Sequence, residues 1–292
     1  MIEEALYEHL RWQDCLRDYL ATYGDGLAVF SQEAPDDTDE CWGEGPQYGR
    51  IVFAVDLQGD PERTMGGMLA VDIMCKADED NEQYPEDIEP IIRQLIHGYF
   101  FSAGRFVVSA QWKNSAYFTE ATDNVKGCTL TFDLLAFPMM TTFDPDVIRR
   151  INEWTHERFD NLYVINFDEL PEKAWKPAGC VSAVYWRLVD EKPAGWIPDT
   201  YATIWRTANL RGHIFAENNA AVVDVARRIA YRLYSDKRLK KQGEAPIMVN
   251  RRNEINPGAD PLRTGQLSVE ATYGVIVYYQ NTQMLDNINV EK

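Results

Sequence analysis

One pattern occurs twice in this sequence, namely an alternating apolar run that leads straight into the start of a helix. Residues 204–219 read IWRTANLRGHIFAENN, and an Ala/Val/Arg-rich stretch follows at once. Residues 63–81, RTMGGMLAVDIMCKADEDN, have the same form about 140 residues earlier. Apolar alternation with a period of two predicts a strand, and a period near 3.6 predicts a helix. Such a recurrence is typical of a structural unit that is present twice.

The predicted elements of the first half follow a definite order. A helix in the first 20 residues precedes strands at 27–35, 50–59 and 68–76. The entry to a second helix begins at Asp80 or Asn81, and Pro85 and Pro90 lie near the start of that helix. Its apolar stripe consists of Ile88, Ile91, Ile92, Leu95, Ile96 and Tyr99. Strands at 105–112 and 128–138 end this half.

The second half repeats that order. Asp144 is the expected N-cap of a helix at 144–159, with Pro145 in its first turn. The next long helix has Asn218 or Asn219 as its expected cap. The remaining predicted elements are strands at 162–171, 183–195 and 207–217, the helix at 218–237, and strands at 246–251 and 267–280.

The sequence therefore predicts an α+β protein of two similar domains, each a small, mostly antiparallel sheet with a long helix packed on it. The domains are residues 1–140, which are acidic, and residues 141–292, with the boundary near Met139–Asp144. A single large α+β domain with an accidental internal similarity is the alternative. With 45% hydrophobic residues, the chain has enough apolar side chains for a folded core.

The excess of negative over positive charge is confined to the first half. Residues 1–140 hold 26 Asp and Glu against 9 Lys and Arg, whereas residues 141–292 hold 20 of each kind. A chain with this balance is a poor candidate for gripping nucleic acid, because that requires clustered Lys and Arg. An acidic surface can still line a path along which DNA slides, or it can serve solubility alone.

Motifs of catalysis and metal binding are missing from the sequence. It has no GxxxxGK[ST], GxGxxG, GxSxG or HExxH pattern, and its four histidines are scattered. The five cysteines are widely spaced, which argues against a disulfide framework and a cysteine zinc site. Residues 78–89 carry acidic side chains at calcium-loop spacing, but Gln83 stands where that loop needs glycine. We expect no cofactor, no metal and no enzymatic activity.

Two charged groups are candidate interaction residues. The acidic candidates are Asp36, Asp37, Asp39 and Glu40. The basic candidates are Lys240, Lys241, Arg251 and Arg252, and the pair Arg227/Arg228 lies nearby. Paired carboxylates can serve acid–base chemistry or hold a metal ion, but in a Gly/Pro-containing loop they are typical of a solvated surface. The basic residues can meet the acidic half of a neighbouring copy.

The second half resembles the tail terminator (tail completion) proteins of long-tailed bacteriophages. The phrases AVYWRLVDEKP and RTANLRGHIFAENNAAVVDVARRIAYRL resemble their strand–loop–strand–helix core. In the first half, YGRIVFAVDLQGDPERTMGGMLAVDIMCK and PEDIEPIIRQLIHGYF hold the corresponding places. The family chains are usually single-domain and about half as long, so this chain looks like a duplicated version.

The resemblance implies a structural role in the virion. Such a protein caps the tail tube as an oligomeric ring, which is hexameric in the family, and meets the tube protein on one side and the neck connector on the other. DNA is then only passing cargo, and the four acidic candidates are expected to line the lumen. The two-domain length leaves open whether three or six chains form the ring.

Other functions fit the same observations. Another phage neck or baseplate protein would share the lack of catalytic motifs, a metal-dependent enzyme would use the acidic clusters, and a cytoplasmic binding module would have no virion role. The N-terminal stretch MIEEALYEHL lacks the basic and apolar regions of a signal peptide. No uninterrupted apolar run is long enough to cross a bilayer. We therefore expect that the protein does not associate with membranes and that it is assembled in the cytoplasm.

Overall fold

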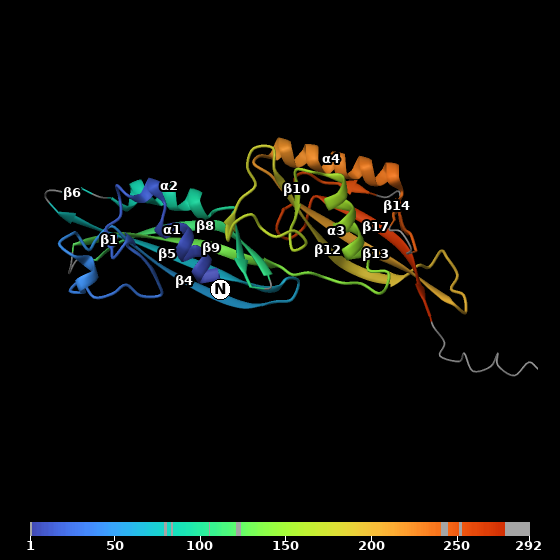
Figure 1. The fold of residues 1–292 in the computed structure, drawn as a ribbon, viewed down its shortest axis with the longest axis horizontal. Helices are drawn as coiled ribbons and strands as arrows, with labels where there is room; N and C mark the ends of the chain where they lie inside the picture. The colour runs from blue at the N-terminus through green and yellow to red at the C-terminus, as the bar shows by residue number, and fades with distance from the viewer. Residues whose placement is uncertain are drawn as a thin grey trace, which may run out of the picture. The chain divides into compact units, whose positions relative to one another are not determined.

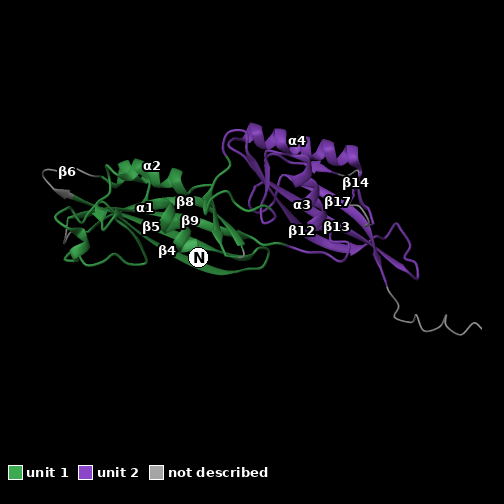
Figure 2. Ribbon diagram, in the orientation of Figure 1, with its two compact units in different colours: residues 1–139, 168–177 green, residues 140–167, 178–292 purple. Residues whose placement is uncertain are grey.

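The chain forms two compact units (Figure 2). In the computed structural model, residues 2–78, 81–82, 84–104, 106–120, 124–240, 245–250 and 253–277 are described. Unit 1 comprises Met1–Met139 with Asp168–Pro177, and unit 2 comprises Met140–Phe167 with Ala178–Lys292. The segment 168–177, which the sequence analysis assigned to the second domain, thus belongs to the first unit. Four α-helices and two curled sheets in the described residues make this a mixed α/β protein.

Unit 1 contains two α-helices, α1 (Ile2–Arg11) and α2 (Pro85–Ile96), and two short 3-10 helices, η1 (Asp14–Leu16) and η2 (Glu40–Trp42). Its strands are β1 (Thr22–Tyr23), β2 (Gly26–Leu27), β3 (Val29–Ser31), β4 (Arg50–Asp60), β5 (Thr64–Asp78), β6 (Asn81–Glu82), β7 (Phe100–Ala103), β8 (Phe106–Glu120), β9 (Val125–Phe137) and β11 (Ala174–Trp175). The short strands β1 and β2 pair only with each other.

The sheet of unit 1 has the order β11–β7–β8–β9–β5–β4–β3. Strand β3 runs parallel to β4, and the other neighbours along this path are antiparallel. The edge strand β11 comes from the segment 168–177, where Ala174 pairs with Phe101. This pairing explains why a stretch distant in sequence is part of unit 1.

The core of unit 1 lies between its helices and one face of the sheet (Figure 1). Side chains at alternating positions of β4, β5 and β9 join the inner faces of α1 and α2 in one buried cluster, which includes Leu6, Ile92, Phe53, Val71 and Phe132. All five are at most 1% exposed. The apolar faces that the strand and helix periodicities predict therefore pack together in this core.

Unit 2 contains the helices α3 (Val147–Arg158) and α4 (Asn219–Asp236). Its strands are β10 (Leu162–Val164), β12 (Ser182–Pro193), β13 (Thr203–Phe215), β14 (Arg238–Leu239), β15 (Ile247–Val249), β16 (Glu254–Ile255) and β17 (Leu267–Ile276). The sheet has the order β10–β12–β13–β17–β15–β14, and β16 also pairs with β17.

Six strands of each sheet follow the same order, while β11 and β6 in unit 1 and β16 in unit 2 have no counterpart. Strands β3, β4, β5, β9, β8 and β7 of unit 1 correspond to β10, β12, β13, β17, β15 and β14 of unit 2. In both units the first strand of this series runs parallel to the second, and a helix follows the third. The helices differ in length, since α2 has 12 residues and α4 has 18.

The core of unit 2 is a separate buried cluster. The inner face of α4, with Val225 and Ile229, packs with α3 and with strand residues such as Trp186, Leu210 and Val269. Trp186 is 1% exposed, and its indole N–H donates to the Thr155 hydroxyl at 3.0 Å. Each unit therefore has its own core.

The helix starts confirm one predicted cap and correct two others. Asn218 caps α4, because its side chain accepts a hydrogen bond from the Ala221 N–H at 3.0 Å. The cap of α3 is Asp146 rather than Asp144, and it accepts from the N–H groups of residues 148 and 149. Pro85, expected near the start of the second helix, is the first residue of α2. The helix entry expected at Asp80 or Asn81 is not there, because Asn81 lies in β6, and Asp80 lies outside the described residues.

Gly67 is expected to be intolerant of substitution. It has a φ of +158°, and a Cβ at this position would lie 2.0 Å from the Asp56 carbonyl oxygen of the neighbouring strand. We expect Gly67→Ala to lower the free energy of unfolding of unit 1 by about 1–3 kcal/mol, because the backbone must shift. Urea denaturation measures this loss.

Gly59 supplies the control for that substitution. It lies in the adjacent strand β4, and a Cβ there would meet nothing within 4 Å. Gly59→Ala should change the free energy of unfolding by no more than about 0.5 kcal/mol. Equal losses for the two variants would contradict the steric explanation.

Candidate functional site

The acidic loop of unit 1 is held in place by its own side chains. Trp42 is buried at its end and donates an indole hydrogen bond to the Asp36 carbonyl at 3.0 Å. Asp37 forms an ion pair with Arg50 at 2.7 Å, and the Arg50 guanidinium lies over the Tyr48 ring. These contacts connect the loop to the start of β4.

The four acidic candidates differ in what they do. Asp39 accepts a hydrogen bond from the Cys41 N–H at 2.8 Å at the start of η2, and this bond lowers the pKa of its carboxyl group. Asp36, Asp37 and Glu40 are exposed, and Asp37 among them is paired with Arg50. The loop thus presents three exposed carboxylates, while Asp37 and Asp39 also take part in its own structure.

The basic candidates are only partly described. Lys240 is exposed just after β14. Lys241, Arg251 and Arg252 lie outside the described residues. The structure therefore places one of these four side chains on the surface of unit 2, close in sequence to the end of α4.

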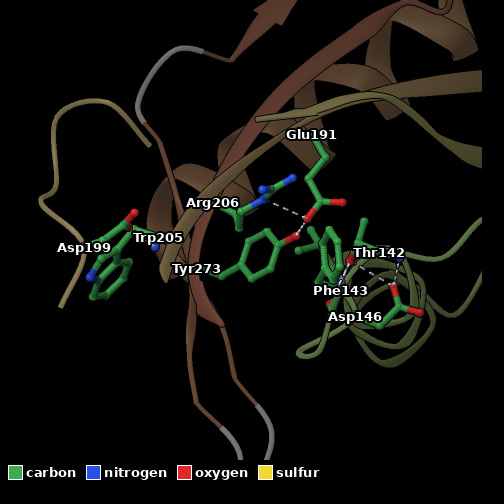
Figure 3. Close-up of polar contacts among 9 residues, drawn as sticks. Thr142, Phe143, Asp146, Glu191, Asp199, Trp205, Arg206 and Tyr273 are labelled. Carbon is green, nitrogen blue, oxygen red and sulfur yellow. Dashed lines mark hydrogen bonds and ion pairs between the residues drawn. The ribbon is translucent and has the colours of Figure 1, made fainter. Parts of the chain in front are cut away.

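A polar network that the sequence analysis did not predict lies at one end of the unit 2 sheet (Figure 3). The Tyr273 hydroxyl on β17 donates to the Glu191 carboxylate on β12, and Arg206 on β13 approaches the same carboxylate oxygen at 3.5 Å. The Arg206 guanidinium also lies 5.0 Å from the centre of the Phe143 ring. Tyr273 is fully buried, and the Glu191 side chain is 12% exposed.

A β-bulge brings the glutamate into this network. The register of β12 against β13 shifts between Leu188 and Asp190, so that Glu191 stands opposite Ala208. Ala208 faces the core, and the bulge therefore turns Glu191 inward beside it. Without the extra residue, the alternation of β12 would direct Glu191 to the other face.

The network also adjoins the segment that enters α3. The Thr142 N–H and hydroxyl contact the Asp146 carboxylate, and the Val147 N–H donates to the Thr142 hydroxyl at 2.8 Å. Burial, and then the hydrogen bond to Glu191, raise the pKa of the Tyr273 phenol above its ordinary value. A fully buried phenol that holds its proton stabilises the fold, and nothing in this geometry exposes a reacting atom.

Large apolar side chains are exposed around the turn that joins β12 to β13. Trp196 is 65% exposed and Tyr201 is 87% exposed. The turn itself is ordered, because the Asp199 carboxylate accepts from the Trp205 N–H at 2.7 Å (Figure 3). Exposed aromatic residues on an ordered turn are typical of a contact surface.

A small open cleft in unit 1 lies beside the end of α1. Its volume is about 340 Å³, and its lining includes Arg11, Trp12 and Arg17. Arg11 pairs with Asp25 at 2.5 Å, and Arg17 pairs with Asp14 at 2.9 Å. Carboxylates of the chain therefore already occupy both guanidinium groups.

The cysteines divide into two classes. Cys15, Cys41 and Cys180 are exposed, whereas Cys75 and Cys128 are buried in the core of unit 1. Burial raises the pKa of Cys75 to about 12 and that of Cys128 to about 11. A buried thiol that keeps its proton is unreactive.

We therefore expect a thiol reagent such as a disulfide dye to modify three cysteines of the folded chain rapidly and the other two only after denaturation. Absorbance titration with and without guanidinium measures both numbers. Cys75→Ala should leave the rapid phase unchanged. Rapid reaction of all five thiols in the native protein would contradict the buried positions.

Comparisons with known proteins add no family assignment. No protein-family model matches the chain, and no curated protein matches it. Among the described residues, no group of three or more His, Cys, Asp or Glu side chains is placed to hold a metal ion. In the same part of the chain, no helix has the length and apolar character needed to cross a membrane.

Proposed function

We propose that this chain is a structural virion protein that caps the end of a phage tail tube as an oligomeric ring and joins the tail to the neck connector. The observation that carries the proposal is the equal strand order of the two units, with a helix after the third strand in each. It supports the interpretation of the chain as a duplicated form of a small α+β unit, as the resemblance to tail terminator proteins implies.

The surfaces of the two units suit such a role. A capping ring needs a contact between copies and a separate face for each neighbour in the particle. Exposed aromatic side chains at Trp196 and Tyr201 offer an apolar contact on unit 2. The excess of negative charge lies in the first half of the chain. The partners are then other copies of this chain, a tail tube protein and a neck connector protein.

The acidic loop is proposed to face the lumen of the ring. Asp36 and Glu40 are exposed there, while Asp37 and Asp39 hold the loop in shape. A wall of like charge repels DNA phosphates, so that the genome passes without sticking. Asp36→Asn with Glu40→Gln should slow DNA ejection from particles. Ejection at the normal rate would remove the lumen from the proposal.

Immunogold electron microscopy tests the function directly. An antibody against this chain is applied to phage particles from a lysate in which the protein is made. Gold at the head–tail junction supports the terminator role. Gold at the distal tip would assign the protein to the baseplate instead, and unlabelled particles beside abundant free protein would contradict a virion role.

A further inference from the structure

Helix α4 has one buried side and one unusually accessible side. Val225, Ala226, Ile229 and Leu233 face the core of unit 2. The other side is open to solvent along the length of the helix, which runs over the surface of its unit (Figure 1). We call this side the α4 outer face; its residues are Asp224, Arg227, Arg228, Tyr231, Arg232 and Tyr234.

The α4 outer face is basic. The helix itself has three Arg against two Asp, and Lys237, Arg238 and Lys240 follow it. Asp224 pairs with Arg228 at 2.9 Å, and Asp236 pairs with Arg158 at 3.3 Å and with Arg232 at 3.8 Å. The carboxylates on the helix therefore do not neutralise Arg227, which is exposed.

Two tyrosines lie among these arginines. Tyr231 is 75% exposed and Tyr234 is 54% exposed. Tyrosine and arginine are the residues enriched at protein interfaces, where they account for much of the binding energy. A face of arginine and tyrosine on an 18-residue helix thus has the composition of a docking surface.

The corresponding helix of unit 1 has the opposite charge. α2 also follows the third strand of its series, and its first turn presents Glu86 and Asp87 to solvent. In the described part of the chain, neither carboxylate belongs to an ion pair. Residues 1–140 hold 26 acidic against 9 basic side chains, so α2 stands on a surface of matching sign.

We propose that the α4 outer face of one copy binds the acidic α2 side of unit 1 in a second copy. The inference rests on the proposed function insofar as that function requires a ring. A contact between two different surfaces is heterologous, and such a contact builds a ring where its rotation closes and an open filament where it does not. Opposite charges speed the encounter and fix its register, while the tyrosines bury apolar area.

Sedimentation velocity on purified chains tests this contact. The wild type should form oligomers in 50 mM NaCl that dissociate in 500 mM NaCl, because salt screens exposed charges. Arg227→Glu combined with Tyr231→Ala should weaken association at least tenfold at low salt. Glu86→Ala combined with Asp87→Ala should weaken association from the other surface, without creating a new charge that would attract the Arg227→Glu variant.

A matched control tests whether a loss of assembly is specific to α4 or follows from any comparable change on the surface of unit 2. Lys192→Glu combined with Phe167→Ala makes the same two kinds of change at exposed positions away from α4. This variant should assemble as the wild type does. Equal loss of assembly in the control and the α4 variant would overturn the proposal.

Mixing the two interface variants gives the sharpest result. Each variant alone should be monomeric where the wild type is oligomeric. A 1:1 mixture contains one intact α4 face and one intact α2 side, so it should form dimers and nothing larger. Dimer formation also shows that both variants are folded.

Besides an equal loss in the control, three results would overturn the inference, namely an α4 variant that assembles normally, a mixture that stays monomeric, or a wild type that is monomeric at low salt. None of them would decide the proposed function, because immunogold labelling locates the protein on particles independently. Conversely, label at the distal tip would reject the terminator role and leave this contact between copies standing.

Discussion

Trp186→Ala is expected to lower the free energy of unfolding of unit 2 by about 3–5 kcal/mol. Trp186 is 1% exposed, and its ring packs against Gly212 on the neighbouring strand. The substitution leaves a large cavity in the core and removes the donor to Thr155, whose hydroxyl itself donates to the Ile151 carbonyl at 2.6 Å. Differential scanning calorimetry should show a transition lowered by on the order of 10 °C.

The control is another tryptophan of the same unit. Trp196 is 65% exposed, so Trp196→Ala should change the free energy of unfolding by no more than about 0.5 kcal/mol. Because unit 1 has its own core, unfolding of that unit, followed through the exposure of Cys75, should keep its midpoint in Trp186→Ala. A parallel loss in both units would contradict separate cores.

The order of the main elements was predictable from the sequence. Apolar stripes and alternating strands are strong signals when they extend over ten or more residues, as in β4, β5, β13 and α4. Two short strands were expected to be longer, since 27–35 contains β3 (Val29–Ser31) and 162–171 contains β10 (Leu162–Val164). The remaining residues of each predicted strand do not pair in the sheet, and the local sequence pattern does not show where the pairing ends.

Other differences have definite physical causes. β8 continues to Glu120 although its last residues, NSAYFTE, are mostly exposed, because pairing with β9 over residues 114–120 satisfies the backbone. β7 was missed because Phe100 and Phe101 extend the apolar stripe of α2, and Gly98, at φ +78°, ends that helix before them. The pairing of β11 with β7 is a long-range contact without a local signal.

Part of the polar network of unit 2 could be predicted from the sequence. Arg206 stands two residues before Ala208 and four before Leu210, so the alternation of this strand directs a charged side chain toward the core. Arg206 is half-buried, and a cation in such a position is stabilised by an acidic partner. The identity of that partner was not predictable, because it depends on the bulge at Val189 that turns Glu191 inward.

Glu191→Ala is expected to lower the free energy of unfolding of unit 2 by about 2–4 kcal/mol, because it leaves the Tyr273 hydroxyl and the Arg206 guanidinium without their shared acceptor. Urea denaturation measures the loss. Asp190→Ala is the matched control, since Asp190 is exposed and accepts only a surface hydrogen bond from Asn209 at 2.6 Å. A loss no larger than in the control would mean that water replaces the carboxylate at no cost.

We expect Tyr273 to make the free energy of unfolding of unit 2 vary with pH in the alkaline range. Its folded pKa is raised from 10.0, chiefly by burial and then by the hydrogen bond to Glu191, so the folded chain holds the phenolic proton more tightly than the unfolded chain does. The stabilisation is complete below pH 10 and is lost as the pH rises toward the folded value. Tyr273→Phe keeps the ring and removes the proton.

We therefore expect Tyr273→Phe to be less stable than the wild type at pH 8, by about 1 kcal/mol for the lost hydrogen bond. Its unfolding free energy should also fall less steeply between pH 9.5 and 11, because one titrating group is gone. Urea midpoints across this range measure both effects. Tyr231→Phe, at a position 75% exposed, should keep the wild-type slope. An unchanged slope in Tyr273→Phe would assign the alkaline loss of stability of unit 2 to groups other than Tyr273.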